Sequence, residues 1–459
     1  MSLRSKIAEY KRYGRGVCHC TFNPGGPGVV RIHLVPPKFR LFGTDAYVVI
    51  LNGYYILPIG SSWAMILAEF IDQVAVFDGK PIGEEDERGI IERTVKRVCK
   101  LYPSVSREDI ELDLCDMLDA IFTAAKGEAP SINIERLSIR KYAKRMTSPH
   151  RMDLMVSAMT DGRGKWQCNQ KCKFCYAAGQ CLSGVKELTT DEWKNAIDKL
   201  KMAGVPMLTF TGGEPTIRND LVELVDYSKW FVTRLNTNGV ALTTKLATAL
   251  RKASLDSVQI TLYSHDEATH NSLVGSEHWA DTVEGIKNAV AAGLDVSVNT
   301  PLCILNKDYL NTVKFIKTLG VRFVTVSGLI CTGGAEGQHQ SYDLSEDQLC
   351  DAVFAAKEYC DEQGMEIDFT SPGLISKYKL EKAGMKVPSC GAALSNMAIA
   401  PDGTVIPCQS WLASGSELGN ILTDDFGSIW NHTMCRKLRS MNEDEAIECP
   451  FRNREGASK

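Results

Sequence analysis

Four cysteines lie close together between residues 168 and 181. Cys168, Cys172 and Cys175 are separated by three and two residues, and Cys181 follows them. Three thiolates can hold three irons of a [4Fe–4S] cluster and leave the fourth iron open for another ligand. A structural zinc ion takes four ligands instead, and Cys181 could supply the fourth. The spacing alone therefore indicates a metal centre of one of these two kinds.

The composition of the chain narrows the class of protein. The 459 residues include 16 cysteines, which in a reducing compartment indicates metal ligation rather than disulfides. The formal net charge of -4 argues against general electrostatic binding to nucleic acid. No apolar run reaches membrane-spanning length, and the N-terminus lacks a secretory signal pattern. We therefore expect a cytoplasmic protein with neither a membrane nor a nucleic acid as its partner.

The elements that must position the cysteines lie in residues 151–340, where strand and helix patterns alternate. Units of roughly thirty residues repeat along this segment, which predicts a parallel sheet with right-handed crossovers. Six such units favour a partial (β/α)6 barrel of the TIM type, an α/β fold, over an open sheet. The cysteines follow the first predicted strand, 154–160. They therefore belong to the end of a barrel where active sites are built.

Two further regions flank the predicted barrel. Residues 1–130 contain a hairpin signal at 47–60, centred on Asn-Gly, and three helical patterns after it, which predicts a winged-helix-like α+β module. The third pattern opens with Ser106 and Asp109, close to a capping box. Residues 131–150 form a linker.

Residues 341–459 contain a helix and a hairpin that turns at Asp402 and Gly403. A last helix is predicted over 426–441. This region is the third domain.

The sequence CNQKCKFCY, residues 168–176, resembles the signature of the radical S-adenosylmethionine (SAM) enzymes, with Phe174 in its aromatic place. The sequence TGGEP, residues 211–215, resembles the second motif of the same family and ends the next strand. The resemblance implies a [4Fe–4S] cluster on Cys168, Cys172 and Cys175, with SAM at the open iron. It also implies that Phe174 contacts the cofactor and that Gly212, Gly213 and Glu214 contact the SAM amino group.

Further strand ends match the family at lower specificity. The resemblance implies cofactor or ribose contacts there, by Asn236, Asn238, Ser264 and Asn299. In the family the cluster gives one electron to SAM, which cleaves to a 5′-deoxyadenosyl radical that abstracts hydrogen from carbon. The cofactor carries this chemistry, and the barrel encloses it. An electron donor such as flavodoxin or ferredoxin is then implied as a partner.

A second group of cysteines flanks the C-terminal hairpin. Cys390 and Cys408, with LGNIL and SIW after them, resemble the opening of a SPASM or shorter twitch extension, and Cys449 is the natural third ligand. The resemblance implies one auxiliary iron–sulfur cluster. Its fourth ligand stays open among Cys435, a substrate thiolate, and Cys18 or Cys20.

The N-terminal module resembles the PqqD-like recognition domains of peptide-modifying systems, in the hairpin and in the helix pair over 89–127. Such domains bind the leader of a precursor peptide as an added β-strand. The three regions together imply a radical SAM maturase of a ribosomally made peptide. Cross-linking, thioether formation, epimerisation and excision all remain open. A hydrogen donor for epimerisation would come from Cys181, Cys303 or Cys331.

Two alternatives to this function stay open on the sequence. One is a radical SAM enzyme that acts on a small-molecule cofactor precursor or on a folded protein. The other is a non-catalytic, zinc-bound recognition protein.

Overall fold

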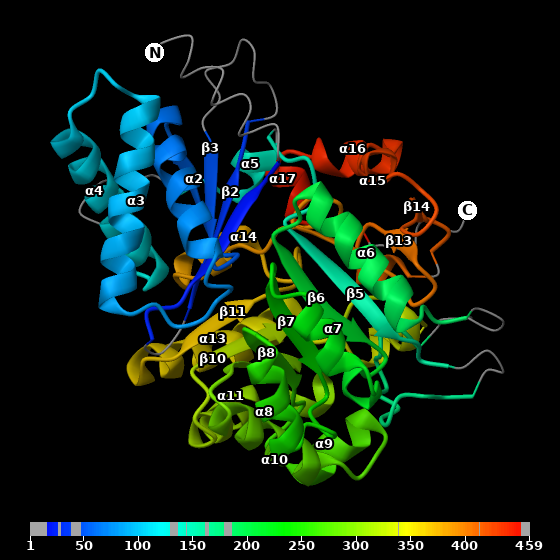
Figure 1. Cartoon of the computed structure of the whole chain (residues 1–459). Helices are drawn as coiled ribbons and strands as arrows, with labels where there is room; N and C mark the ends of the chain where they lie inside the picture. The colour runs from blue at the N-terminus through cyan, green and yellow to red at the C-terminus, as the bar shows by residue number, and fades with distance from the viewer. Residues whose placement is uncertain are drawn as a thin grey trace. The chain divides into compact units, whose positions relative to one another are not determined.

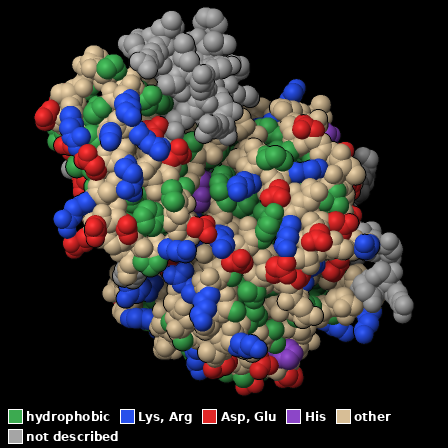
Figure 2. Space-filling model, viewed as in Figure 1, with side chains coloured by type: hydrophobic (Ala, Val, Ile, Leu, Met, Phe, Trp, Pro, Cys, Tyr) green, Lys and Arg blue, Asp and Glu red, His purple; other side chains and the backbone are tan. Residues whose placement is uncertain are grey.

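The computed structural model describes residues 16–25, 29–37, 47–128, 136–143, 145–160, 165–178, 186–337, 339–412 and 414–450 (Figure 1). The described residues divide into two compact units. The first unit runs to His150 and includes the short segments Leu200–Met207 and Trp230–Val232, and the second unit contains the rest. None of the helices within these ranges is long and apolar enough to cross a bilayer. On the face shown in Figure 2, basic and acidic side chains are interspersed.

A four-stranded antiparallel sheet, in the order β1-β2-β3-β4, forms the centre of the first unit. Its strands are β1 (Cys18–Phe22), β2 (Val30–Val35), β3 (Tyr47–Leu51) and β4 (Tyr55–Ile59). Between β3 and β4 the chain turns at Asn52 and Gly53, whose φ angles are 49° and 67°. Asn-Gly favours this turn because both residues tolerate a positive φ. The predicted hairpin is confirmed, and β1 and β2 are additional strands.

Three helices complete the first unit: α2 (Ser61–Ala75), α3 (Glu84–Leu101) and α4 (Arg107–Ala125). Helix α4 begins as predicted, since Ser106 Oγ accepts a hydrogen bond from the Asp109 N–H at 3.0 Å. Apolar side chains of the helices and the sheet, among them Val49, Phe70 and Leu114, form one buried core. The short helix α5 (Ile139–Ala143) follows.

The second unit is built on one ten-stranded sheet, in the order β11-β10-β9-β8-β7-β6-β5-β12-β13-β14. Pairing is parallel from β7 through β11, and β5 pairs in parallel with β12. The six predicted barrel strands are present as β5 to β10, which confirms the partial barrel. The strands are β5 (Arg151–Ser157), β6 (Met207–Gly212), β7 (Val232–Thr237), β8 (Ser257–Thr261), β9 (Asp295–Pro301), β10 (Phe323–Ser327), β11 (Glu366–Phe369), β12 (Asn396–Ile399), β13 (Thr404–Ile406) and β14 (Gly419–Asn420).

Helices connect the barrel strands at the predicted places, and Figure 1 shows α7, α8 and α10 beside the green strands. The predicted connecting helices are α6 (Thr190–Ala203), α7 (Leu221–Tyr227), α8 (Thr244–Lys252), α10 (Trp279–Ala291) and α11 (Tyr309–Thr318). Helix α13 (Glu346–Gln363), predicted as the opening of the third region, is also present. The short helices α12 (His339–Tyr342) and α14 (Lys377–Lys382) were not predicted, and a further helix, α9 (Glu267–Val274), lies between β8 and α10. Helix α9 was not predicted. It begins where Asp266 accepts the Thr269 N–H at 2.8 Å and ends at Gly275, whose φ is 62°.

Three further details differ from the sequence-based expectation. Strand β5 begins at Arg151 rather than at 154, because the buried Asp153 is paired with Arg151 at 2.8 Å. The barrel sheet continues past residue 340 into β11. The single helix expected over 426–441 is two helices, α15 (Phe426–Trp430) and α16 (Thr433–Arg439). They are separated because His432 Nδ1 accepts the Met434 N–H and starts a new helix.

Candidate active site

The three barrel cysteines lie on the loop that follows β5, and backbone hydrogen bonds fix this loop to its neighbours. The N–H groups of Lys171 and Lys173 donate to the carbonyls of Val274 and Leu273, at 2.9 and 2.8 Å, at the end of α9. The Cys175 carbonyl accepts the Gly334 N–H at 2.8 Å. The unpredicted helix α9 therefore holds the cysteine loop. Cys181 lies outside the described residues.

Phe174 anchors the same loop through apolar contacts. Its side chain is buried in a cluster with Tyr263, Leu273, Val274 and Cys303. Phe174, at the aromatic position of the family motif, therefore packs against apolar side chains in this chain. A contact between Phe174 and a cofactor stays a prediction.

The two glycines at the end of β6 allow close packing against the end of β5. Gly212 has a φ of 134°, and a Cβ atom there would lie 2.4 Å from the Ser157 carbonyl oxygen. At Gly213 a Cβ atom would lie 2.9 Å from the Ala158 oxygen, and its N–H donates to Ser157 O at 2.8 Å. Only glycine fits this approach. The TGGEP segment therefore packs directly on the start of the cysteine loop.

Glu214 joins the ends of β6 and β7. Its Oε1 atom accepts hydrogen bonds from the Thr216 hydroxyl at 2.5 Å and the Thr237 hydroxyl at 2.6 Å. Its Oε2 atom accepts the Asn238 N–H at 2.8 Å. Burial raises the pKa of this carboxyl, and these donors oppose that rise by stabilising the carboxylate. Glu214 organises this corner of the barrel in addition to any contact with an ammonium group.

Asn238 extends the connection to the cysteine loop. Its Nδ2 donates to Asn169 Oδ1 at 2.6 Å, and Asn169 directly follows Cys168. The backbone N–H and the side chain of Asn238 therefore link Glu214 to the residue beside the first cysteine. Asn169 was not predicted as a site residue, because the residues around it in the sequence carry no pattern that indicates this contact.

The remaining predicted contact residues lie on strand ends. Asn299 Oδ1 accepts the Thr325 hydroxyl at 2.9 Å, and Gln259 Nε2 donates to the same hydroxyl at 2.9 Å. Asn236 Oδ1 is buried and has no hydrogen-bond partner among the described residues, so it can accept one from a ligand. Ser264 Oγ accepts the Asp266 N–H at 3.0 Å, close to the start of α9. Ribose contacts by these residues stay a prediction.

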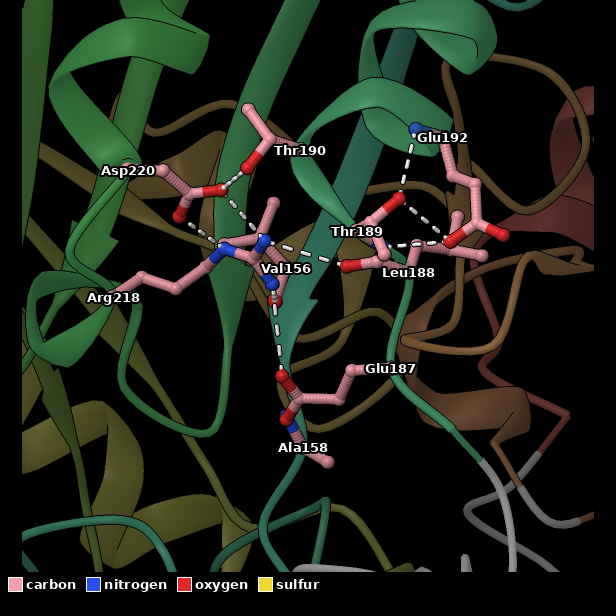
Figure 3. Close-up of polar contacts among 9 residues, drawn as sticks. All are labelled: Val156, Ala158, Glu187, Leu188, Thr189, Thr190, Glu192, Arg218 and Asp220. Atoms are coloured by element: carbon pink, nitrogen blue, oxygen red, sulfur yellow. Dashed lines mark hydrogen bonds and ion pairs between the residues drawn. The ribbon is translucent and has the colours of Figure 1, made fainter.

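Arg218, three residues after the TGGEP segment, connects the segments of chain that enter and leave the cysteine loop (Figure 3). Its guanidinium donates to the Val156 carbonyl at 2.7 Å, before the loop, and to the Leu188 carbonyl at 3.3 Å, after it. Asp220 accepts two further bonds, at 2.7 and 2.8 Å, and orients the guanidinium. This forked geometry is specific to arginine.

Glu187 adds a contact on the same side (Figure 3). Its Oε1 accepts the Ala158 N–H at 2.7 Å, and its Oε2 lies 3.6 Å from Arg218 Nη1. The start and the end of the cysteine loop are therefore held together by side chains of two residues, neither of which was predicted from the sequence.

The C-terminal cysteines also come together. The pKa of the Cys408 thiol is raised to about 12, chiefly by burial and in part by the nearby Cys390 and Cys449 thiols. The Cys390 N–H donates to the Ala446 carbonyl at 2.6 Å, at the end of α17 (Glu443–Ala446). This bond brings the chain on the N-terminal side of the hairpin close to the segment that carries Cys449. The predicted hairpin is present as β12 and β13, with its turn at Asp402 and Gly403.

Comparison with protein families identifies both regions. Residues 167–325 match the radical SAM superfamily, and residues 390–450 match SPASM, an iron-sulfur cluster-binding domain. The chain contains a radical SAM domain and a SPASM domain. A radical SAM domain carries a [4Fe–4S] cluster and binds SAM, and a SPASM domain adds an auxiliary iron–sulfur site.

Solved structures share this fold. The crystal structure of Streptococcus suis SuiB bound to precursor peptide SuiA has a TM-score of 0.58 at 13% identity, over 86% of this chain and 88% of that chain. SuiB bound to S-adenosylmethionine gives 0.56 at 14% identity, over 86% and 87%. Native anSMEcpe with bound AdoMet gives 0.50 at 14% identity, over 66% and 86%. At such identities the likeness concerns the fold.

The donor set of the radical SAM domain fits the cluster. Burial raises the pKa of Cys168 to about 12 and raises the pKa values of Cys172 and Cys175, so these thiols need a positive charge nearby to ionise. Iron bound to these three residues would supply that charge. No three His, Cys, Asp or Glu side chains in the described ranges are close enough together to hold a single metal ion. Thiolates that share a cluster bind different irons and need not approach one another as closely.

Two of the residues that were considered as the fourth ligand of the auxiliary cluster, Cys435 and Cys20, are buried. Cys435 is buried and hydrogen-bonded to Arg439, whose guanidinium stacks 3.7 Å from the Trp430 ring centroid. Cys20 lies on β1 with a side chain 1% exposed, inside the core of the first unit. A role of Cys435 or Cys20 as the fourth ligand stays a prediction.

Proposed function

We propose that this chain is a radical SAM maturase that modifies a ribosomally made precursor peptide by hydrogen abstraction. The observation that supports it best is the hydrogen-bonded path from Glu214 through Asn238 to Asn169, which joins the TGGEP segment to the cysteine loop. In this proposal Cys168, Cys172 and Cys175 hold the cluster. A cluster bound there would supply the electron for reductive cleavage of SAM, and the barrel residues would bind and orient that ligand.

The residues of this chain bind and orient SAM. Gly212 and Gly213 expose backbone groups because neither carries a side chain, and the carboxylate of Glu214 suits an ammonium group. Asn236, with an unpartnered buried oxygen, and Asn299 and Ser264 on later strands are the proposed contacts to the rest of the ligand. The barrel walls exclude water from the site.

The precursor peptide is the proposed partner of the first unit. Its antiparallel sheet ends in β1 on one side and β4 on the other, and no further strand of the described chain pairs beside β1. Such an edge can accept an extended leader segment as an added strand. SuiB, which shares the fold, has been crystallised with a precursor peptide. A PqqD-like role of residues 1–130 and a cytoplasmic location belong to this proposal.

The SPASM domain supplies one auxiliary cluster, with Cys390, Cys408 and Cys449 as proposed ligands. Anaerobically reconstituted protein is then expected to contain about eight irons per chain, and about four if no auxiliary cluster forms. Cys408→Ala should lower the iron content by about half and leave SAM binding to the barrel intact. Cys360→Ala is the matched control, because it removes a buried thiol from α13 that is not among the proposed ligands, and its iron content should match that of the wild type.

Incubation of the reduced protein with SAM and a candidate precursor peptide tests the proposal. We expect release of 5′-deoxyadenosine together with a mass change in the peptide, and loss of both in Cys172→Ala. A leaderless peptide should react poorly because the first unit cannot hold it. If SAM is cleaved but no peptide with a leader is modified, while a small molecule or a folded protein is, the peptide assignment is wrong.

A further inference from the structure

Gln170 lies inside the cysteine loop, between Cys168 and Cys172, and its side chain is buried, with 3% of the residue exposed. The Cys172 thiol donates to Gln170 Oε1, with 3.6 Å between sulfur and oxygen. The other amide atom, Nε2, is buried and has no hydrogen-bond partner among the described residues. A buried N–H group without a partner lowers the stability of the fold by roughly 1–3 kcal/mol. A second arrangement, with a rotated amide that gives this N–H group a partner, would remove that loss.

The second arrangement follows from what happens to the sulfur when a cluster is bound. A cysteine that binds iron has lost its proton, so it can accept a hydrogen bond but cannot donate one. The amide oxygen would then face a negatively charged sulfur. A half-turn about the last side-chain bond exchanges oxygen and nitrogen in nearly the same space. The N–H group then points at the sulfur from about the position that the oxygen now occupies.

The backbone around Gln170 keeps the side chain near Cys172. Trp166 Nε1 donates to the Gln170 carbonyl at 2.7 Å, and the Lys171 N–H donates to the Val274 carbonyl at 2.9 Å. These two bonds fix the backbone on both sides of the Gln170 side chain. Rotation of the amide therefore needs no movement of the loop.

We propose that Gln170 donates an amide N–H to the Cys172 sulfur of the loaded cluster and thereby raises the reduction potential of that cluster. Reduction adds one electron, and the added negative charge is shared with the cysteine sulfurs. A hydrogen bond to sulfur is stronger in the reduced state, so it favours reduction. Gln170 is a positioning and tuning residue that touches a ligand rather than the substrate. This inference rests on the assignment of Cys172 as a cluster ligand.

Gln170→Met tests the hydrogen bond, since methionine matches glutamine in length but has no donor. Gln167→Met is the matched control, because Gln167 is in the same loop with its side chain exposed. The midpoint potential is measured by a redox titration followed by EPR, with and without SAM. The signal that changes with SAM belongs to the barrel cluster. We expect Gln170→Met to disfavour reduction by about threefold to tenfold, where tenfold is about 59 mV for one electron.

A second measurement applies to the wild-type protein and does not depend on how the variant folds. Protein labelled with ¹⁵N in the glutamine side-chain amides should show a ¹⁵N hyperfine coupling in the pulsed EPR of the reduced barrel cluster. An absent coupling would overturn the proposal, as would equal midpoint potentials in Gln170→Met and Gln167→Met. Cys172→Ala separates the two assignments: if it retains a complete barrel cluster, Cys172 is not a ligand, and the failure lies there.

Discussion

The carboxylate of Glu214 and the backbone N–H of Asn238 are joined by a hydrogen bond of 2.8 Å, although 24 positions separate the two residues. The bond links the ends of two neighbouring barrel strands at the level of the cysteine loop. The same carboxylate also accepts the N–H and the hydroxyl of Thr216 and the hydroxyl of Thr237, so it accepts four hydrogen bonds within the site.

Glu214→Gln should weaken both the fold and SAM binding. The amide keeps the shape of the side chain, but its NH₂ group would face a donor, which leaves one buried group unpaired. We expect a loss of about 1–3 kcal/mol in the free energy of unfolding. The dissociation constant of SAM should rise at least about tenfold. Urea unfolding and anaerobic calorimetry measure the two effects. Glu223→Gln, at an exposed site, should change neither.

Arg218→Gln should loosen the cysteine loop, because the carbonyls of Val156 and Leu188 lose a donor and Asp220 loses its charged partner. A destabilisation of about 2–4 kcal/mol is expected, with a lower iron content after reconstitution. Arg218→Lys keeps the charge but not the fork, and should recover only part of the loss. A full iron content and an unchanged melting temperature in Arg218→Gln would contradict this role.

Gly212→Ala should be far more damaging than Gly293→Ala. Both glycines have a positive φ, 134° and 72°, but a Cβ atom on Gly293 meets no atom within 4 Å. At Gly212 it would meet the Ser157 oxygen at 2.4 Å. Backbone strain costs about 1–3 kcal/mol at either site, and overpacking adds about 1–3 kcal/mol only at Gly212. Comparison of the two melting temperatures checks this, and equal losses would show that the contact at Ser157 does not matter.

His270 should make stability depend on pH in the mildly acidic range. Burial lowers the pKa of this ring to about 4. In the unfolded chain it is about 6.5, so the contribution to stability is complete above that pH and is lost as the pH falls towards 4. The loss between pH 7 and pH 5 is about 2 kcal/mol. Urea unfolding at both pH values should show a smaller difference for His270→Gln. Parallel curves for the two proteins would refute this origin.

Much of this architecture could be predicted from local patterns. The alternation of strand and helix patterns predicted the barrel. Asn52-Gly53 and Asp402-Gly403 predicted the two hairpins, because the turn conformation depends on adjacent residues. The cysteine spacing and the glycines at 212 and 213 indicated the site for the same reason. Each of these signals lies within a few positions of the chain.

Other parts depend on partners far apart in the sequence. Asn169 contacts Asn238 across 69 positions, and Arg218 reaches Val156 across 62, so neither residue carries a local signal. Strand β1 was missed because its alternation, from Cys18 to Phe22, is short and is interpretable only when β2 lies beside it. The early start of β5 was hidden by Asp153, a charged residue whose burial depends on its pairing with Arg151.

The parallel pairing of β12 with β5, from Asn396 opposite Arg151 to Ile399 opposite Leu154, joins the SPASM hairpin to the barrel sheet. The C-terminal region is therefore part of the same sheet as the barrel strands. A protein truncated before β12 would lose the cover of its first barrel strand and expose a row of backbone donors and acceptors there. Such an edge pairs readily with another chain, so truncation invites aggregation as well as the loss of a cluster.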